Sequence, residues 1–270
     1  MTTATLSPSL TTARLSGSGI LRSEWIKLRS LRSTVWSYLI VIAMSLGLAA
    51  LLASTMPDEA LRLSDPAATA LGSATGGLMF GQLVVAVLGV LVVSGEYSTG
   101  MIRSTLTAVP RRLPALWAKA VVLFVATFVV GAVSTVGSFL LASSILGGRG
   151  IEASLLDEGV LLALAGGSLY LALVAVFALG IGTMLRSSAG GIAAALGILL
   201  LLPVVLQLIP TEWAADLIPY TPSAAGMALS ALPGDTIAGQ PEVWQSGLAL
   251  LAWVAASILG AALLLKRRDA

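Results

Sequence analysis

Neither cysteine nor histidine occurs in this 270-residue chain. Without cysteine there are no disulfides and no thiolate chemistry, and without histidine there is no imidazole to bind a metal or act as a general base. These absences exclude the usual zinc and iron sites and a serine–histidine hydrolase. The sequence also has no G-x-x-x-x-G-K-[ST] loop, so we expect that the chain does not hydrolyse ATP itself. We predict no catalytic residues, no metal site and no cofactor in this chain.

Charged residues are also scarce. They make up 10% of the chain, against about 25% in an ordinary soluble domain, whereas 57% of the residues are hydrophobic. Six stretches of 23 to 30 residues carry no charge at all: 33–57, 66–95, 120–148, 159–185, 187–211 and 243–265. A helix needs about 20 apolar residues to cross the ~30 Å hydrocarbon core of a bilayer, and charges are costly at that depth. Each stretch is therefore long enough to span a membrane.

These runs predict an all-α polytopic membrane protein with six transmembrane helices, preceded by an amphipathic interfacial helix. Residues 1–19, rich in serine, threonine, glycine and alanine, are predicted to be a disordered tail, and residues 20–270 a six-span domain. We place the spans at about 35–54, 72–93, 120–146, 160–185, 189–209 and 246–265.

The distribution of charge predicts the topology. If the N-terminus is cytoplasmic, 13 of the 15 basic residues lie on the inner side, and only Arg62 and Arg149 lie outside. Ten of the 13 acidic residues then lie outside. The positive-inside rule therefore predicts that both termini are cytoplasmic. Because topology explains the basic bias, we expect no nucleic-acid partner.

Residues 20–34 carry apolar side chains at helical spacing, among them Leu21, Trp25 and Leu28, with basic residues between them. A basic amphipathic helix beside a span usually lies in the membrane interface. This segment is therefore interpreted either as an anchor at anionic lipid headgroups or as a helix that also contacts a cytoplasmic partner.

Three features interrupt the apolar spans. Gly77 and Gly81 form a G-x-x-x-G pattern, which allows close helix packing within one subunit or at a dimer contact. Gln82 is expected to form a hydrogen bond in a helix contact, and Pro203 predicts a kink in the fifth span.

No acidic residue falls inside a predicted span, and Glu96 stands at most at the inner boundary of the second. Carriers coupled to protons or sodium usually need a carboxylate in the membrane core. The membrane part thus has no visible energy source of its own. We expect a soluble partner to press on the cytoplasmic side, at the 94–119 loop and the basic amphipathic helix.

These two segments resemble the ABC type-2 permease family. Residues 23–30 (SEWIKLRS) are similar to its N-terminal interfacial helix, and residues 95–103 (GEYSTGMIR) to its signature after the second span. A Pro-Arg-Arg element at 110–112 and Lys119, opening the third span, also agree with the family pattern, as does PYTPSAAG at 219–226. The chain departs from it at Met101, where threonine is common.

The resemblance implies the permease subunit of an ATP-driven exporter. Its partners would be a separate cytoplasmic ATP-binding subunit, which holds ATP and magnesium, and a second permease subunit in a homodimer or heterodimer. Cargo would move along the subunit interface. The residues implied at the coupling contact are Glu24, Lys27, Arg29, Glu96, Tyr97, Gly100, Arg103, Arg111 and Arg112. Gly100 is expected to end or bend the second span.

Two other function classes stay open: an autonomous secondary carrier or channel, and a membrane scaffold that transports nothing. The apolar spans fit amphiphilic or hydrophobic cargo, such as drugs, antibiotics or lipids. Much alanine, glycine and arginine with little lysine is typical of GC-rich bacteria. We therefore predict a multi-pass protein of a bacterial cell membrane, surrounded by membrane lipid.

Overall fold

The computed structural model of the chain describes residues 16–63, 65–101, 112–232 and 241–267, and every regular element in these ranges is a helix. Within the described ranges, six helical segments are long and apolar enough to cross a membrane, which confirms the predicted all-α, six-span fold. They are Arg32–Thr55, Pro66–Ser98, Leu113–Gly147, Val160–Leu185, Ser188–Leu208 and Val243–Arg267. Residues 1–15, the greater part of the predicted tail, lie outside the described ranges.

The six segments comprise α2 (Arg32–Thr55), α4 (Pro66–Thr75) with α5 (Leu78–Ser98), α7 (Arg112–Gly147), α8 (Val160–Leu185), α9 (Ser188–Leu196) with η2 (Gly197–Leu201) and α10 (Leu202–Leu208), and α13 (Val243–Arg267). The remaining helices of the described residues are α1 (Gly17–Ser30), α3 (Asp58–Leu63), α11 (Glu212–Leu217), η3 (Ile218–Tyr220) and α12 (Pro222–Ala228). The last three of these lie between the fifth and the sixth spanning segments.

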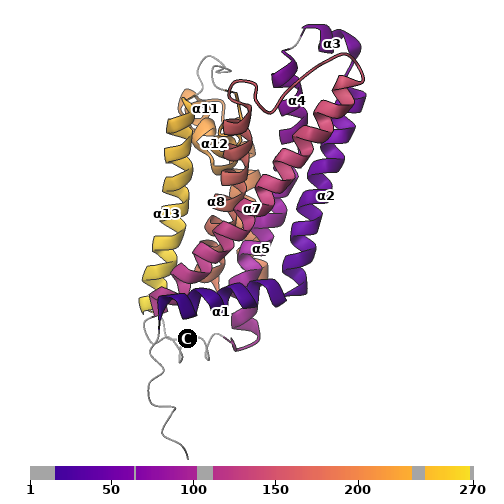
Figure 1. The fold of residues 1–270 in the computed structure, drawn as a ribbon. Helices are drawn as coiled ribbons and strands as arrows, with labels where there is room; N and C mark the ends of the chain where they lie inside the picture. The colour runs from indigo at the N-terminus through magenta and orange to yellow at the C-terminus, as the bar shows by residue number, and fades with distance from the viewer. Residues whose placement is uncertain (1–15, 64, 102–111, 233–240, 268–270) are drawn as a thin grey trace, which may run out of the picture.

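The spanning helices form a bundle, and α1 lies across one end of it (Figure 1). The C-terminal ends of α5 and α13 and the start of α7 lie at the same end as α1, whereas α3, α11 and α12 lie at the opposite end (Figure 1). We call the end that carries α1 the basic end, because Arg22, Arg29, Lys119, Lys266 and Arg267 belong to it.

Two predicted boundaries near the N-terminus are wrong. The interfacial helix occupies Gly17–Ser30 rather than 20–34, because the Ser16 side chain accepts a hydrogen bond from the Gly19 backbone N–H and caps the helix at that point. At its other end the backbone of Leu31 is extended, and the first spanning helix begins at Arg32. A charge-free run marks where the apolar stretch starts, whereas a spanning helix can include flanking charges whose side chains reach toward water.

Both ends of the segment predicted as a loop, 94–119, belong to helices instead. Helix α5 continues to Ser98 and α7 begins at Arg112, so only residues 99–111 separate the two helices. The prediction placed the third span at 120–146, and the structure extends its helix by two turns toward the basic end. Lys119 therefore lies within a helix instead of at the edge of a loop.

The fifth span, for which a kink at Pro203 was predicted, departs from regular α-helix just before this residue. The interruption takes the form of a π-helical segment, Gly197–Leu201, followed by a helix with proline in its first turn. Proline has no backbone N–H to donate to the helix, and the wider π-helical turn lies just before it.

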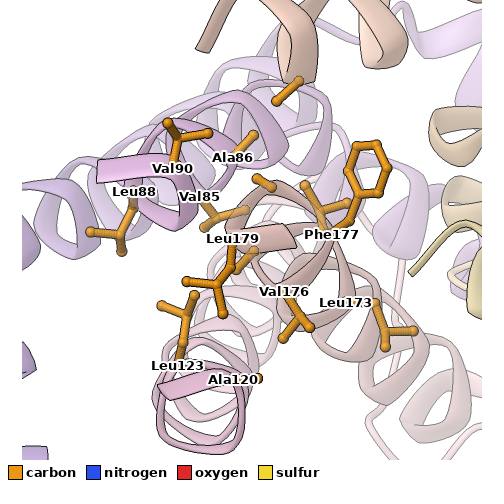
Figure 2. Packing of buried hydrophobic residues seen from close by; sticks show 14 of the residues in the cluster. Val85, Ala86, Leu88, Val90, Ala120, Leu123, Leu173, Val176, Phe177 and Leu179 are labelled. Carbon is orange, nitrogen blue, oxygen red and sulfur yellow. The ribbon is translucent and has the colours of Figure 1, made fainter. Parts of the chain in front are cut away.

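Helix α8 is the centre of the bundle. In the most apolar 18-residue stretch of α8, 72% of the residues are buried, against 17% in the corresponding stretch of α2. Helix α8 packs against α5, α7, α9 and α13. Figure 2 shows this core, where Val85 and Leu88 of α5 and Leu123 of α7 approach Val176 and Leu179 of α8. Helices α5 and α8 approach closely where Gly89 of α5 faces Ala175 and Ala178 of α8. Small residues are suited to this place, since helix association in a bilayer depends on packing rather than on the exclusion of water.

Polar contacts also join the helices in the core. The Tyr170 hydroxyl of α8 donates a hydrogen bond to Gln82 Oε1 of α5, which confirms the predicted role of Gln82. Thr135 of α7 and Ser168 of α8 are hydrogen-bonded through their hydroxyls at 3.1 Å. Each bond satisfies polar atoms that have no water at this depth.

The G-x-x-x-G pair lies inside the subunit. A Cβ atom added at Gly77 would lie 2.6 Å from the Cα of Ser45 in α2, and one at Gly81 would lie 3.5 Å from the Leu171 side chain of α8. Both glycines thus serve helix packing within the chain, and a dimer contact through them stays a prediction.

Candidate functional site: an ion-pair cluster at the basic end

Four charged side chains from three helices meet at the basic end. Lys119 Nζ of α7 lies 2.5 Å from Glu24 Oε2 of α1 and 2.8 Å from Glu96 Oε1 of α5. Lys27 Nζ of α1 lies 2.8 Å from Glu24 Oε1 and 3.0 Å from Glu96 Oε1. We refer to Glu24, Lys27, Glu96 and Lys119 as the ion-pair cluster. It joins segments that are 95 residues apart in the chain.

Most of the cluster is buried. The exposed fraction of the side chain is 3% for Glu24 and 8% for both Glu96 and Lys119, whereas Lys27 is 29% exposed. Two carboxylates and two ammonium groups make the cluster electrically neutral, so each buried charge has an opposite charge beside it. One atom is the exception to full pairing: Glu96 Oε2 is buried and has no hydrogen-bond partner within the described part of the chain.

The local sequence of α1 explains why its charged face is turned inward. Lys27 and Leu28 follow Glu24 by three and four residues and so lie on the same side of the helix as Glu24, and Glu24 and Leu28 are buried. Leu21 and Trp25, which belong to the predicted apolar stripe, are 39% and 44% exposed. The helix therefore attaches to the bundle through ion pairs and Leu28, and it presents other apolar side chains outward, as an interfacial helix does.

The end of α5 is attached to a second part of the bundle. The guanidinium carbon of Arg186, in the turn between α8 and α9, lies 5.3 Å from the centre of the Tyr97 ring, within the range of a cation–π contact. The Ser188 hydroxyl of α9 donates to the Ser94 hydroxyl at 2.8 Å. These contacts hold the last turn of α5 against the α8–α9 turn.

Gly100 ends α5. Its φ is +72°, in the left-handed region that favours glycine, and its backbone N–H donates to the Tyr97 carbonyl oxygen at 3.3 Å. A Cβ atom at this position would meet open space, so backbone conformation alone demands glycine here. The prediction that Gly100 ends or bends the second span is confirmed.

The structure brings some of the predicted coupling residues together and leaves others apart. Glu24, Lys27 and Glu96 belong to the cluster, Tyr97 follows it, and Arg29 is exposed on α1. Arg103 and Arg111 lie outside the described residues, and Arg112 is the first residue of α7. Lys119, which pairs with both carboxylates, was absent from the predicted coupling set. A single lysine directly before the long apolar run 120–148 was the signal that could have identified it.

A cavity of about 380 Å³ lies beside the cluster. It opens between α1, the start of α2, the end of α5 and the first turns of α7, and all four members of the cluster line it. The site thus combines a mechanical connection between three helices with a space large enough for a small ligand group.

Burial raises the pKa of Glu24, but Lys119 and Lys27 outweigh this effect, and the net pKa lies below its usual value of 4.5. Burial lowers the pKa of Lys27, and the two carboxylates outweigh it, so the net pKa lies above 10.5. Both charged forms are thus favoured in the folded protein at neutral pH.

These directions predict how stability depends on pH. Because the folded-state pKa of Glu24 is lowered, its contribution is present above pH 4.5 and is lost as the pH falls through the lowered value. The contribution of Lys27 is present below pH 10.5 and is lost as the pH rises through the raised value. We expect wild type to exceed Glu24→Gln in thermal unfolding temperature by a constant amount between about pH 5 and pH 10, and by less in acid. An equal difference at neutral and acidic pH would contradict this account.

Comparison with protein families yields one match. Residues 20–210 match the family described as "ABC-2 family transporter protein". The matched region contains the whole ion-pair cluster and the first five spans. A search of curated proteins found no match.

Proposed function

Because this chain belongs to the ABC-2 transporter family, we propose that it is the permease subunit of an ATP-driven exporter. In this proposal the basic end faces the cytoplasm, and a separate ATP-binding subunit docks there. The permease moves amphiphilic or hydrophobic cargo outward and works with a second permease subunit.

The family and the fold support the coarser part of this statement. Six apolar helices and a match to a transporter family describe a multi-pass membrane transport protein rather than an enzyme. The charge pattern supports the orientation, because nine described basic residues belong to the cytoplasmic segments of the predicted topology: Arg22, Lys27, Arg29, Arg32, Arg112, Lys119, Arg186, Lys266 and Arg267.

The ion-pair cluster is the observation that carries the coupling proposal. Through Lys119 and Lys27, helix α1 is tied at once to the end of α5 and to the start of α7. Separating these helices would leave buried charges unpaired, which is strongly unfavourable. A force applied to α1 or to the chain after α5 therefore reaches two spanning helices together. These two helices, α5 and α7, pack against α8 in the core of the bundle.

An affinity purification tests the proposal. The tagged full-length chain is extracted in mild detergent, and ATPase activity and co-purifying chains are measured in the eluate, with chemical crosslinking before extraction to retain weak partners. Recovery of an ATP-binding subunit supports the permease. Absence of one in crosslinked membranes overturns it. Transport by the purified chain alone would then identify a carrier, and no transport would favour a scaffold.

Gly100→Leu is expected to reduce the recovered ATPase by about tenfold or more while leaving membrane insertion intact. A side chain at φ +72° costs about 1–2 kcal/mol, which displaces the chain as it leaves α5 toward the proposed contact. Gly150→Leu is the matched control, because Gly150 also has a positive φ (+83°) and open space around it but lies in the turn after α7, at the opposite end. Equal ATPase recovery from the two variants would contradict the coupling contact.

A further inference from the structure

Helix α1 has two chemically different faces. The face with Glu24 and Leu28 is buried against the bundle. Positions spaced by three, four and seven residues fall on one side of a helix, and on the other side of α1 such positions hold two basic and two large apolar residues: Arg22, Trp25, Ile26 and Arg29. All four are exposed, Trp25 at 44% and Ile26 at 56%. We call these four residues the exposed face of α1, and this face is both cationic and apolar.

The two arginines of the exposed face have no counter-charge. Glu24 is the acidic residue of α1, and its carboxylate is already paired with Lys27 and Lys119 on the buried side. Within the described part of the chain, neither Arg22 nor Arg29 takes part in an ion pair. The two guanidinium groups start about 10 Å apart along the helix axis, at a rise of about 1.5 Å per residue. A negatively charged partner would therefore complement this face.

The position of α1 brings this face to the surface of the membrane. Leu31 is the one residue between α1 and the spanning helix α2, and α1 runs across the end of the bundle (Figure 1). The first turns of α2 also expose apolar side chains, with Val35 at 48% and Trp36 at 64%. Tryptophan is enriched at the level of the lipid headgroups, and arginine can hold its guanidinium there while its stem contacts apolar atoms. At this level a bilayer offers phosphate groups and acyl chains together, which matches both halves of the exposed face.

We propose that the exposed face of α1 binds anionic phospholipids of the bilayer. Arg22 and Arg29 donate to phosphate oxygens of the heads, for which the planar guanidinium is well suited, and Trp25 and Ile26 contact the upper carbons of the acyl chains. An anionic lipid is preferred because its net negative charge balances the arginines, whereas a choline head carries a cation of its own. This binding does not depend on ATP coupling. Helix α1 is then held from two sides, by the ion-pair cluster and by lipid.

Two lipid probes test the proposal on the unmodified full-length protein. The protein is placed in phosphatidylcholine nanodiscs with a trace of phosphatidylglycerol or of phosphatidylcholine, each carrying the same photoreactive group on the upper part of one acyl chain. Crosslinked peptides are identified by mass spectrometry. We expect phosphatidylglycerol to label the peptides of α1 about thirtyfold more strongly, the factor that corresponds to ~1 kcal/mol for each of two arginines at an anionic surface. The preference is expected to weaken in about 1 M salt, which screens exposed charges.

Two paired variants locate the labelling. Arg22→Gln combined with Arg29→Gln is expected to bring the two probes close to equal labelling of α1. Lys266→Gln combined with Arg267→Gln is the matched control, because it removes the same charge from exposed residues of α13 at the same end of the bundle, and it is expected to retain the preference (Figure 1). Equal labelling of the unmodified protein by both probes overturns the proposal, and so does an equal loss of preference in the two variants.

A protein contact on the same face would give a different result. If the exposed face of α1 binds the ATP-binding subunit instead, neither probe is preferred, and Arg22→Gln with Arg29→Gln lowers the ATPase recovered from crosslinked membranes. That outcome overturns the lipid proposal and leaves the permease proposal in place. Loss of the lipid preference in this variant with unchanged ATPase recovery supports lipid as the occupant.

Discussion

Lys119→Met is expected to destabilise the folded protein by about 3–5 kcal/mol, the usual cost of removing one partner from a buried ion pair. Lys119 is the member of the cluster that contacts both glutamates with its own side chain largely buried, at 2.5 Å from Glu24 and 2.8 Å from Glu96. Without it, two buried carboxylates face one partly exposed ammonium, that of Lys27. Methionine keeps the length of the side chain, so the loss would come from charge rather than from an empty space.

The measurement is the thermal unfolding temperature of the detergent-solubilised protein, together with the yield of monodisperse material. Lys266→Met is the matched control, because Lys266 is exposed at the end of α13, and we expect it to change stability little. Adding Glu24→Gln to Lys119→Met is expected to recover part of the loss, since it removes one unpaired charge. Equal stability of Lys119→Met and Lys266→Met would show that the cluster does not hold α1 in place.

Gly89→Ala is expected to produce the second large effect, a destabilisation of about 1–3 kcal/mol or more from overpacking. A Cβ atom at Gly89 of α5 would lie 2.2 Å from the carbonyl oxygen of Ala175 in α8 and 3.1 Å from the Ala178 side chain. The obstacle is backbone, which cannot rotate away as a flexible side chain would. Because α8 is the centre of the bundle, α5 and α8 would have to separate along their shared face.

Gly95→Ala provides the control in the same helix. A Cβ atom at Gly95 meets nothing within 4 Å, so the substitution adds helix propensity without a clash and is expected to be neutral or stabilising by up to about 1 kcal/mol. The comparison uses thermal unfolding of both variants under identical conditions. A Gly89→Ala protein as stable as Gly95→Ala would contradict the close α5–α8 packing.

The two ends of the molecule are constructed differently. At the basic end, helices are joined by buried opposite charges and by the contact between Arg186 and Tyr97. At the other end, Arg149 donates to the carbonyl oxygens of Ala53 and Met56 and pairs with Asp58, so one basic residue ties the turn after α7 to the end of α2. Arg149, one of the two basic residues that the predicted topology places outside, therefore has a structural role there.

The sequence alone determined the class of the molecule, because a hydrocarbon environment penalises charge wherever it occurs along a chain. The charge-free runs therefore indicated six spans, and for α8 they matched the observed bounds, Val160–Leu185. The helix ends were less predictable where a helix extends beyond its apolar run, as α7 does through Lys119. The resemblance of residues 23–30 and 95–103 pointed to the family, which the comparison then showed.

Only the tertiary structure decided which charges meet. Glu24 and Lys119 are 95 residues apart, and nothing in their local sequence specifies that the inward face of α1 lies on the first turns of α7. The same holds for the unpaired oxygen of Glu96 and for the cavity beside it, since both depend on the distances between α1, α5 and α7. Hydrophobicity is a property of a segment and can be read along the chain, whereas pairing and cavity shape depend on how packed helices approach one another.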